Sequence, residues 1–209
     1  MSLPARTERQ FRSIVVPEAM QPSRIWPGTA PFTEIAARLD LYRVEFKKNG
    51  PRTFVVKRYA EDDAEFWSRH GKQHPFRIIP PQIKDWAFEL PPGTVLDAEL
   101  LTARRAGADP EEVDRLYVFD VVRLRGADAC HVTLERRKEL LGTVAASGDS
   151  DGAILVATDL REYNPGATLS MHYERALLEG DEGVVLKLKS SLYRGGESPC
   201  WLKIRKEGA

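Results

Sequence analysis

The sequence predicts an α+β fold in which antiparallel sheets are flanked by helices. Strand-like segments predominate and most of them are separated by turns or polar loops. Helical segments are inserted among these strands and do not follow each strand in turn, which argues against a regular parallel sheet. The composition is globular, with 42% hydrophobic and 30% charged residues, so 209 residues can bury a proper core.

The first half of the chain contributes mainly strands. A proline-rich segment at 1–32 is expected to be an extended lead-in to one domain at 33–209. Thr33 is expected to cap a short helix that reaches Leu39. Polar residues alternate with Tyr42, Val44 and Phe46, which predicts a half-buried strand before the turn at Gly50-Pro51. Further strands are expected at 53–58, 65–69, 94–102 and 116–124.

The second half carries two longer helices and two closing strands. Thr133 is expected to cap a helix that reaches Leu141 and exposes Arg136, Arg137 and Lys138. Helical spacing from Leu169 ends at Gly180, a common C-terminal signal. Strands are then expected at 183–189 and 200–206.

Bulk properties exclude several classes of protein. The 31 basic residues balance the 31 acidic ones, which argues against a dedicated nucleic-acid coat protein but leaves room for a local basic groove. Two cysteines are too few for a disulfide framework, and we find neither a membrane-length apolar run nor a signal-peptide core. A cytoplasmic location is the default expectation. No glycine-rich phosphate fingerprint supports a Rossmann or P-loop fold.

Lys47 is the candidate nucleophile. It lies in the pattern Lys-Lys-Asn-Gly-Pro-Arg, which ends at Arg52. A lone strand lysine is nearly always a solvated charge, and only its context argues for chemistry. Alternation turns Lys48 to the other face, so Lys47 is preferred, and a second cation such as Lys203 would favour the neutral amine that attack requires.

Later segments supply acids, cations and an aromatic ring. Glu45 lies two residues before Lys47, and Asp97 and Glu99 share one face of a strand, where two carboxylates need a cation or a ligand hydroxyl. Glu182 and Lys187 would face one ligand only if the strand bends at Gly183. Each residue also has a simpler interpretation, a solvated charge or, for Phe119, a core ring. The remaining candidates are Arg69, which follows Ser68, and the pair Lys203 and Arg205, which share a strand face.

Taken in this order, the segments resemble the nucleotidyltransferase domain of the covalent ligases, the family of ATP-dependent DNA and RNA ligases and capping enzymes. The resemblance runs from about Glu34 to Lys206 and implies an ATP-grasp-like ligase fold. It implies that Lys47 forms a phosphoramidate with AMP. The remaining implied roles are nucleotide or nick contact for Arg52, adenine contact for Glu45, nucleotide or phosphate contact for Arg69, ribose or metal contact for Glu99, metal binding for Glu182, purine stacking for Phe119 and α-phosphate neutralisation for Lys187, Lys203 and Arg205.

The resemblance also implies cofactors and partners. The cofactors are ATP and Mg²⁺, and the partner is nicked DNA with a 5′-phosphate. No association with a membrane is implied. Asn49 replaces the family's usual aspartate, Ala98 replaces a glycine, and Arg205 replaces a lysine. No OB-fold domain is expected within the chain. Three explanations stay open: the chain is a fragment, the partner domain comes from another polypeptide, or the domain has another role. The alternatives are an RNA ligase, a GTP-using capping-type transferase, or a non-catalytic nucleotide- or nucleic-acid-binding relative that needs a partner.

Overall fold

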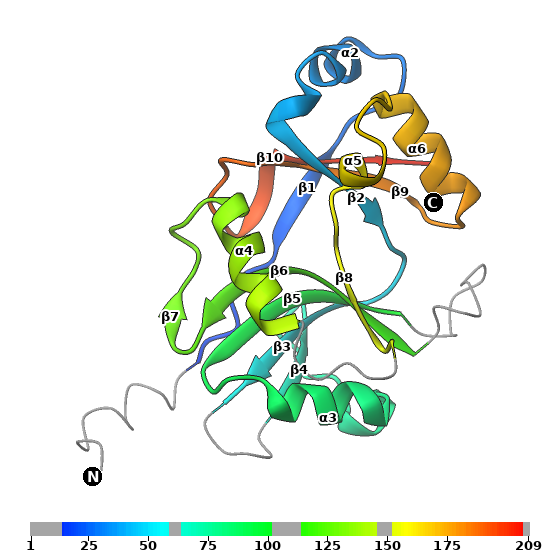
Figure 1. The fold of residues 1–209 in the computed structure, drawn as a ribbon. Coiled ribbons are helices and arrows are strands. Elements are labelled where there is room, and N and C mark those ends of the chain that lie inside the picture. The colour runs from blue at the N-terminus through cyan, green and yellow to red at the C-terminus, as the bar shows by residue number, and fades with distance from the viewer. Residues whose placement is uncertain (1–13, 59–63, 102–113, 146–151, 207–209) are drawn as a thin grey trace.

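Two β-sheets with helices on their outer sides make up the structure (Figure 1). The computed structural model describes residues 14–58, 64–101, 114–145 and 152–206. The predicted α+β class is confirmed, and most neighbouring strands are antiparallel. Thr102, the last residue of the strand predicted at 94–102, and residues 1–13 of the predicted lead-in lie outside the described residues.

The four-stranded sheet has the order β1-β10-β9-β2. Figure 1 shows helices beside this sheet, on the side away from the second sheet. The elements are β1 (Met20–Arg24), β2 (Tyr42–Lys47), β9 (Gly183–Leu188), β10 (Gly196–Arg205), α2 (Ala30–Ala36), α5 (Leu160–Tyr163) and α6 (Leu169–Leu178), with a 3-10 turn at Leu39–Leu41. Alternate residues of the strands, such as Val44, Val184 and Ile204, are buried in a cluster with α5 and α6 residues. The opposite face is therefore left for other side chains.

The second sheet has the order β4-β3-β5-β6-β7, and β8 pairs with β6 in parallel. Its elements are β3 (Arg52–Lys57), β4 (Ala64–Ser68), β5 (Thr94–Leu101), β6 (Arg115–Leu124), β7 (Ala127–Asp128), β8 (Ile154–Val156), α3 (Pro81–Glu89) and α4 (Leu134–Ala145), with a 3-10 turn at Phe76–Ile78. Residues of α3 and α4 are buried against this sheet in one hydrophobic cluster. The rich run of Val and Leu in β5 and β6 explains why both strands are almost wholly buried.

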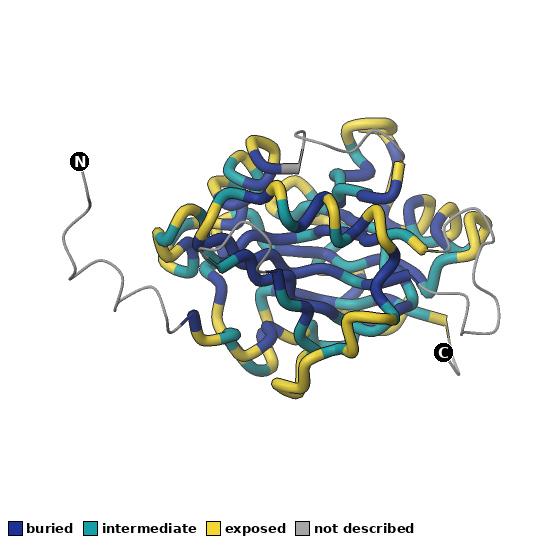
Figure 2. The backbone as a smooth tube through the Cα atoms, turned by 90° about the horizontal axis from the view of Figure 1, so that it is seen from below, coloured by how far each residue is buried: buried dark blue, intermediate teal, exposed yellow. Residues whose placement is uncertain are grey.

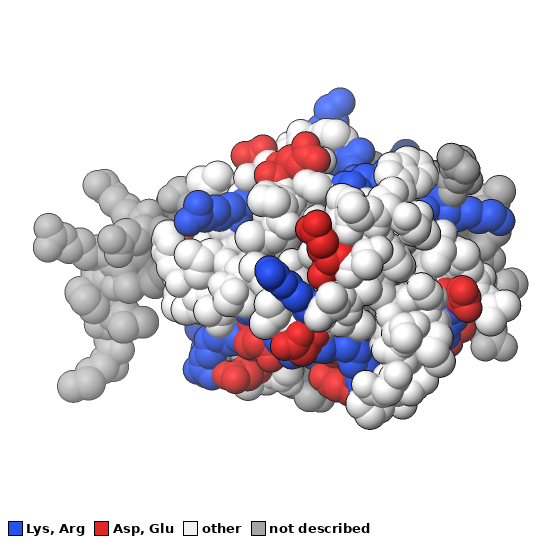
Figure 3. Space-filling view, turned by 90° about the horizontal axis from the view of Figure 1, so that it is seen from above, with Lys and Arg blue, Asp and Glu red and all other residues white. Residues whose placement is uncertain are grey.

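A third hydrophobic cluster joins the two sheets. Met20 and Trp201 of the first sheet pack with Phe54, Val56 and Val95 of the second. Figure 2 shows buried residues along the central strands and exposed residues mainly in the surrounding helices and loops. On the face seen in Figure 3, acidic and basic side chains are interspersed, as the balanced composition leads one to expect.

The structure corrects several local predictions. Within the predicted lead-in at 1–32, β1 pairs in parallel with β10. The helix expected from Thr33 begins earlier, at Ala30, with Thr29 at the N-cap. The final strand begins at Gly196 and not at Cys200. Proline can occupy the first turn of a helix because its missing N–H has no partner there, which accounts for the unpredicted α3 with its Pro81 start.

Candidate active site

A pocket of about 580 Å³ lies between the two sheets and collects every predicted site residue. Its size is within the range that small-molecule sites occupy. Strands β2, β9 and β10 of the first sheet and β3, β5 and β6 of the second line it. The ten predicted residues along its wall are Glu45, Lys47, Arg52, Arg69, Glu99, Phe119, Glu182, Lys187, Lys203 and Arg205.

Strand register explains how the first sheet supplies its part of the pocket. Lys47 lies opposite Gly183, and Gly183 lies opposite Arg205. Two residues along, Val185 lies between Glu45 and Lys203 in the same way. Since side chains two apart on a strand point to the same face, these rows share the face away from the α6 cluster. The helices thus bury one face of the sheet and leave the other to the pocket.

Lys47 forms an ion pair with Glu182. The two side chains are 21% and 14% exposed, so a ligand can still reach them. Removal from water, and then the positive charges of Arg205 and Lys47, lower the pKa of Lys203. One acid and three cations therefore occupy this part of the pocket, which we call the phosphate end: Lys47, Glu182, Lys203 and Arg205.

Gly183 permits the tight contact between β9 and β10 at the phosphate end. Its φ is +143°, in a region that side chains disfavour. A Cβ atom here would lie 2.0 Å from the carbonyl oxygen of Ile204. The strand pairing runs through Gly183 without a register shift, and Glu182 and Lys187 both line the pocket.

A second group of charges surrounds Glu45 and lies apart from the phosphate end. The Lys187 Nζ atom is 2.6 Å from the Glu45 carboxylate, and Lys138 of α4 pairs with the other oxygen. The same Nζ lies 4.4 Å from the centre of the Phe119 ring and 4.3 Å from that of Trp201. We call Glu45, Lys138, Lys187 and Phe119 the base end. The sequence grouped Lys187 with Lys203 and Arg205, whereas the structure places it at the base end.

Burial, together with a smaller effect of the nearby Lys138, lowers the pKa of Lys187 to about 8, while Glu45 and Asp120 oppose the shift. The side chain is only 3% exposed. Lysine is strongly hydrated in water, so the ammonium form is disfavoured at such a depth unless anions compensate. Lys187 therefore changes charge close to neutral pH.

Arg52 is already engaged by the protein. Its Nε and Nη2 atoms donate to both oxygens of Asp97, at 2.8 and 2.5 Å, and Nη1 donates to the Met20 carbonyl. The Tyr193 hydroxyl donates to Asp97 at 2.7 Å. Asp97 is wholly buried, so the arginine supplies the cation that the paired carboxylates on β5 require.

Glu99 remains available to a ligand. It accepts a hydrogen bond of 2.9 Å from the Gly50 N–H, and removal from water raises its pKa to about 7. Arg69, by contrast, is exposed at the edge of the pocket, where its Nε atom donates to His70 at 3.1 Å. Both residues line the pocket, but of the two only Glu99 is positioned by a hydrogen bond from the backbone, the one from the Gly50 N–H.

The side chains offer limited means to hold a metal ion. Among the described residues, no three His, Cys, Asp or Glu side chains are grouped as a metal site. Glu99 and Glu182 both line the pocket. Two carboxylates suit Mg²⁺, which takes one or two of them together with phosphate oxygens and retains several waters.

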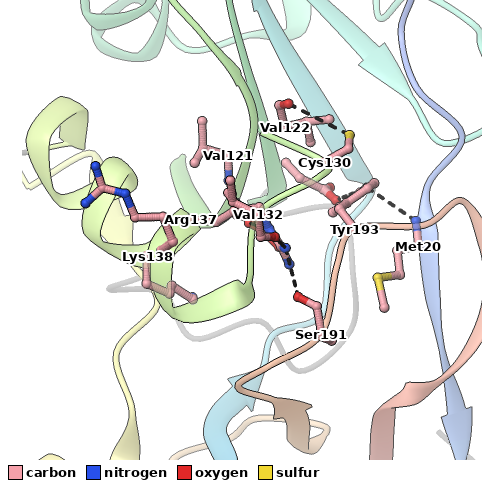
Figure 4. A network of polar contacts seen from close by, with 12 residues as sticks. Met20, Val121, Val122, Cys130, Val132, Arg137, Lys138, Ser191 and Tyr193 are labelled. Carbon is pink, nitrogen blue, oxygen red and sulfur yellow. Dashed lines mark hydrogen bonds and ion pairs between the residues drawn. The ribbon is translucent and has the colours of Figure 1, made fainter. Parts of the chain in front are cut away.

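The prediction that Arg136, Arg137 and Lys138 are all exposed is wrong for two of them. Arg137 is completely buried and pairs with Asp120, and it donates to the carbonyls of Val132 and Ser191 (Figure 4). The Lys138 side chain is 7% exposed and holds Glu45. Only Arg136 lies at the surface.

A helical signal could have located Arg137. It lies three residues after Leu134 and four before Leu141, on the apolar face that both leucines mark. Lys138 follows on the edge of that face. The burial of Arg137 and Lys138 could therefore have been predicted from their helical spacing relative to Leu134 and Leu141.

Comparisons with known proteins identify relatives of the chain. Residues 110–205 match the family model described as the ATP dependent DNA ligase domain. DNA ligase 2 of Thermofilum pendens is 25% identical over 181 residues, which cover 81% of this chain and 30% of that protein. DNA ligase 4 of Kluyveromyces lactis is 31% identical over 123 residues, or 56% of this chain and 13% of that one.

Solved structures share the fold. Mycobacterial DNA ligase D, solved in complex with ATP and MES, gives a TM-score of 0.62 at 18% identity, covering 90% of this chain and 59% of that chain. The chain therefore spans less than a third of the length of each of these two curated relatives and 59% of the solved ligase D chain. No described helix is long and apolar enough to cross a membrane. The chain is similar to the ATP-dependent DNA ligases and has the fold of their nucleotidyltransferase domain.

Proposed function

We propose that the chain is the adenylation domain of an ATP-dependent DNA ligase. Lys47 attacks the α-phosphate of ATP, forms a phosphoramidate with AMP and releases pyrophosphate. AMP then passes to the 5′-phosphate at a nick, and attack by the 3′-hydroxyl releases it and seals the strand. The observation that carries this proposal is the phosphate end, where the pocket holds Lys47 and Glu182 together with Lys203 and Arg205.

Charge explains why this arrangement suits the first step. Lys47 must lose a proton before it can attack, and Glu182 is the acceptor with which it already pairs. Lys203 and Arg205 are cations that offset the charge of the α-phosphate. Phosphoryl transfer depends mainly on positioning and charge neutralisation, and the pocket supplies both.

Two further parts of the pocket fit the nucleotide and its cation. Glu99 and Glu182 are the carboxylates that would hold Mg²⁺, which when bound neutralises phosphate charge. At the base end, the Phe119 ring is only partly buried and offers a face on which a purine can stack. The Glu45 carboxylate would accept a hydrogen bond from the adenine amino group.

Radioactive labelling tests the proposal. The purified chain is incubated with Mg²⁺ and ATP labelled either at the α-phosphate or at the γ-phosphate, and then resolved on a denaturing gel. We expect acid-labile label on the protein from α-labelled ATP and none from γ-labelled ATP, because pyrophosphate leaves. Label from neither would contradict the proposal and favour a non-catalytic relative, and transfer from GTP would favour a capping-type enzyme.

We also propose that sealing requires an OB-fold partner in trans or on the same protein. Lys47, Lys187, Lys203 and Arg205 belong to the phosphate end or the base end. Among the other described cations of the pocket, Lys48 pairs with Asp181 and Arg52 with Asp97, and Arg69 lies exposed at the edge, so we assign none to the departing pyrophosphate. A closing domain would orient that group and keep water from the phosphoramidate.

This second proposal predicts slow sealing by the chain alone. We expect single-turnover sealing of a nicked duplex to accelerate when the OB-fold domain of a related ligase is added. An unrelated OB-fold of similar charge is the control. If the chain alone seals nicks as fast as it adenylates itself, it needs no such partner.

A further inference from the structure

The base end contains a charge arrangement that the proposed function leaves unexplained. One carboxylate, Glu45, is 1% exposed and pairs with two lysines. The Lys138 and Lys187 side chains are only 7% and 3% exposed. Burying two ammonium groups around one carboxylate is costly, since only one of the charges is compensated.

A second buried acid, Asp120, does not compensate the extra positive charge around Glu45. Asp120 is wholly buried and lies close enough to influence Lys187. Both of its oxygens, however, accept hydrogen bonds from Arg137, at 2.8 and 3.1 Å. The group of five charges around Asp120 and Glu45 thus contains two acids and three cations: Arg137, Lys138 and Lys187. A net positive charge surrounds Glu45.

The Glu45 oxygens also keep hydrogen-bonding capacity. Neither receives a hydrogen bond of normal geometry from the described residues, although both lie beside ammonium groups. Glu45 and Lys187 line the pocket, whereas Lys138 reaches Glu45 from α4 behind them. Lys138 can therefore affect a ligand only through the two pocket residues beside it, Glu45 and Lys187.

The position of Lys138 is fixed by its neighbour in the sequence. Arg137 bonds to Asp120 of β6, to the Val132 carbonyl and to the Ser191 carbonyl, so it ties the start of α4 to two other parts of the fold. Lys138 is carried on the same helical turn. Its ammonium group is thus delivered to Glu45 by a rigid support.

We propose that Lys138 is a positioning residue that orients the Glu45 carboxylate as a hydrogen-bond acceptor, so that the base end accepts a purine with a 6-amino donor and rejects one with a 6-oxo group. This inference rests on the proposed function and extends it to nucleotide selection. An ionised carboxylate has only acceptors, so a 6-amino group can donate to it and a 6-oxo group is repelled. A 6-amino purine gains a hydrogen bond to Glu45, whereas a 6-oxo purine leaves a buried acceptor unpaired.

Lys138 has a second effect, on Lys187, that gives the proposal an independent signature. The charged groups facing Lys187 are Glu45 of β2, Lys138 of α4 and Asp120 of β6. Lys138 opposes the cationic form, so its removal raises the pKa of Lys187 above the value of about 8 that it has now. Lys187 is cationic below its pKa, and any nucleotide affinity that depends on this charge should persist to higher pH without Lys138.

The test compares nucleotide binding by matched variants. Dissociation constants for ATP and inosine triphosphate are measured by calorimetry from pH 6.5 to 9.5 for the unsubstituted chain, Lys138→Met, Lys138→Arg and Arg136→Met. We expect the unsubstituted chain to prefer ATP by about ten-fold or more, corresponding to about 1.4 kcal/mol. Lys138→Met should lose most of this preference and shift its pH midpoint upward. Lys138→Arg should restore both, and Arg136→Met, at the exposed neighbouring position, should change neither.

Each outcome decides the inference. A folded Lys138→Met variant with the original preference and pH midpoint would overturn it, and Lys138→Gln replaces the methionine variant if that one does not fold. Binding of neither nucleotide by the unsubstituted chain would overturn this inference and the proposed function together. If discrimination depends on Lys138 as expected but ATP leaves no label on the protein, the inference stands and the adenylation proposal fails.

Discussion

Replacing Lys47 with arginine is expected to eliminate the covalent AMP adduct, whereas replacing Lys48 with arginine should leave most of it. Both substitutions keep the positive charge and remove a primary amine, so they differ only in which nucleophile is lost. Removing a covalent nucleophile commonly costs about a thousand-fold or more in rate. The pair is a demanding comparison because both lysines line the pocket.

The structure favours Lys47 because its ion pair is the more accessible of the two from the pocket. Lys47 pairs with Glu182, which lies in the same pocket, and Lys203 and Arg205 share its strand face. Lys48 is bound to Asp181, with its Nζ atom 3.1 Å from the carboxylate, and its side chain is 6% exposed. Initial rates of label incorporation measure the difference. The reverse result would place the nucleophile one residue later than the motif indicates.

Replacing Arg137 with methionine is expected to lower the free energy of unfolding by about 3–5 kcal/mol. Arg137 and Asp120 are both wholly inaccessible to solvent, and the arginine makes two hydrogen bonds to the carboxylate. Without it, Asp120 becomes an uncompensated buried charge, and the Val132 and Ser191 carbonyls each lose one donor. A domain of this size has a total stability of only about 5–15 kcal/mol, so the loss is large.

Urea unfolding of three variants measures this effect. Arg136→Met is the matched control, because Arg136 is exposed and its ion pair with Glu139 is worth about 0.5 kcal/mol or less. The double substitution Arg137→Met with Asp120→Leu removes both charges and should recover part of the lost stability. Equal losses from Arg136→Met and Arg137→Met would show that burial of the pair does not stabilise the fold.

Local periodicity was sufficient to predict much of the fold. The alternation through Tyr42, Val44 and Phe46 is reproduced by β2, and the helix ending near Gly180 is present as α6. Strand β1 escaped prediction because Pro22 interrupts its pattern and its pairing partner lies in β10, far along the chain. Such a strand is defined by its neighbour and carries little signal of its own.

The candidate site was predicted as a set of residues but not as an arrangement. Motif order was enough to gather residues such as Glu45 and Lys203 into one pocket. It could not separate the phosphate end from the base end, since Lys187 reaches Glu45 only through the pairing of β9 with β2. Nor could it assign Lys138, whose partner lies 93 positions earlier in the chain, at Glu45.

The parallel pairing of β1 with β10 has a consequence for biosynthesis. Met20 lies opposite Gly196, so the ribosome adds 176 residues after Met20 before Gly196 is in the chain. At about 5–20 residues per second, β1 waits roughly 10–35 s for its neighbour in the sheet. Lys203 and Arg205 are supplied by that same last strand, and until it is translated Lys47 faces no cation from β10. A nascent chain therefore cannot assemble the phosphate end, and the unpaired edge of β9 has to be shielded until β10 emerges.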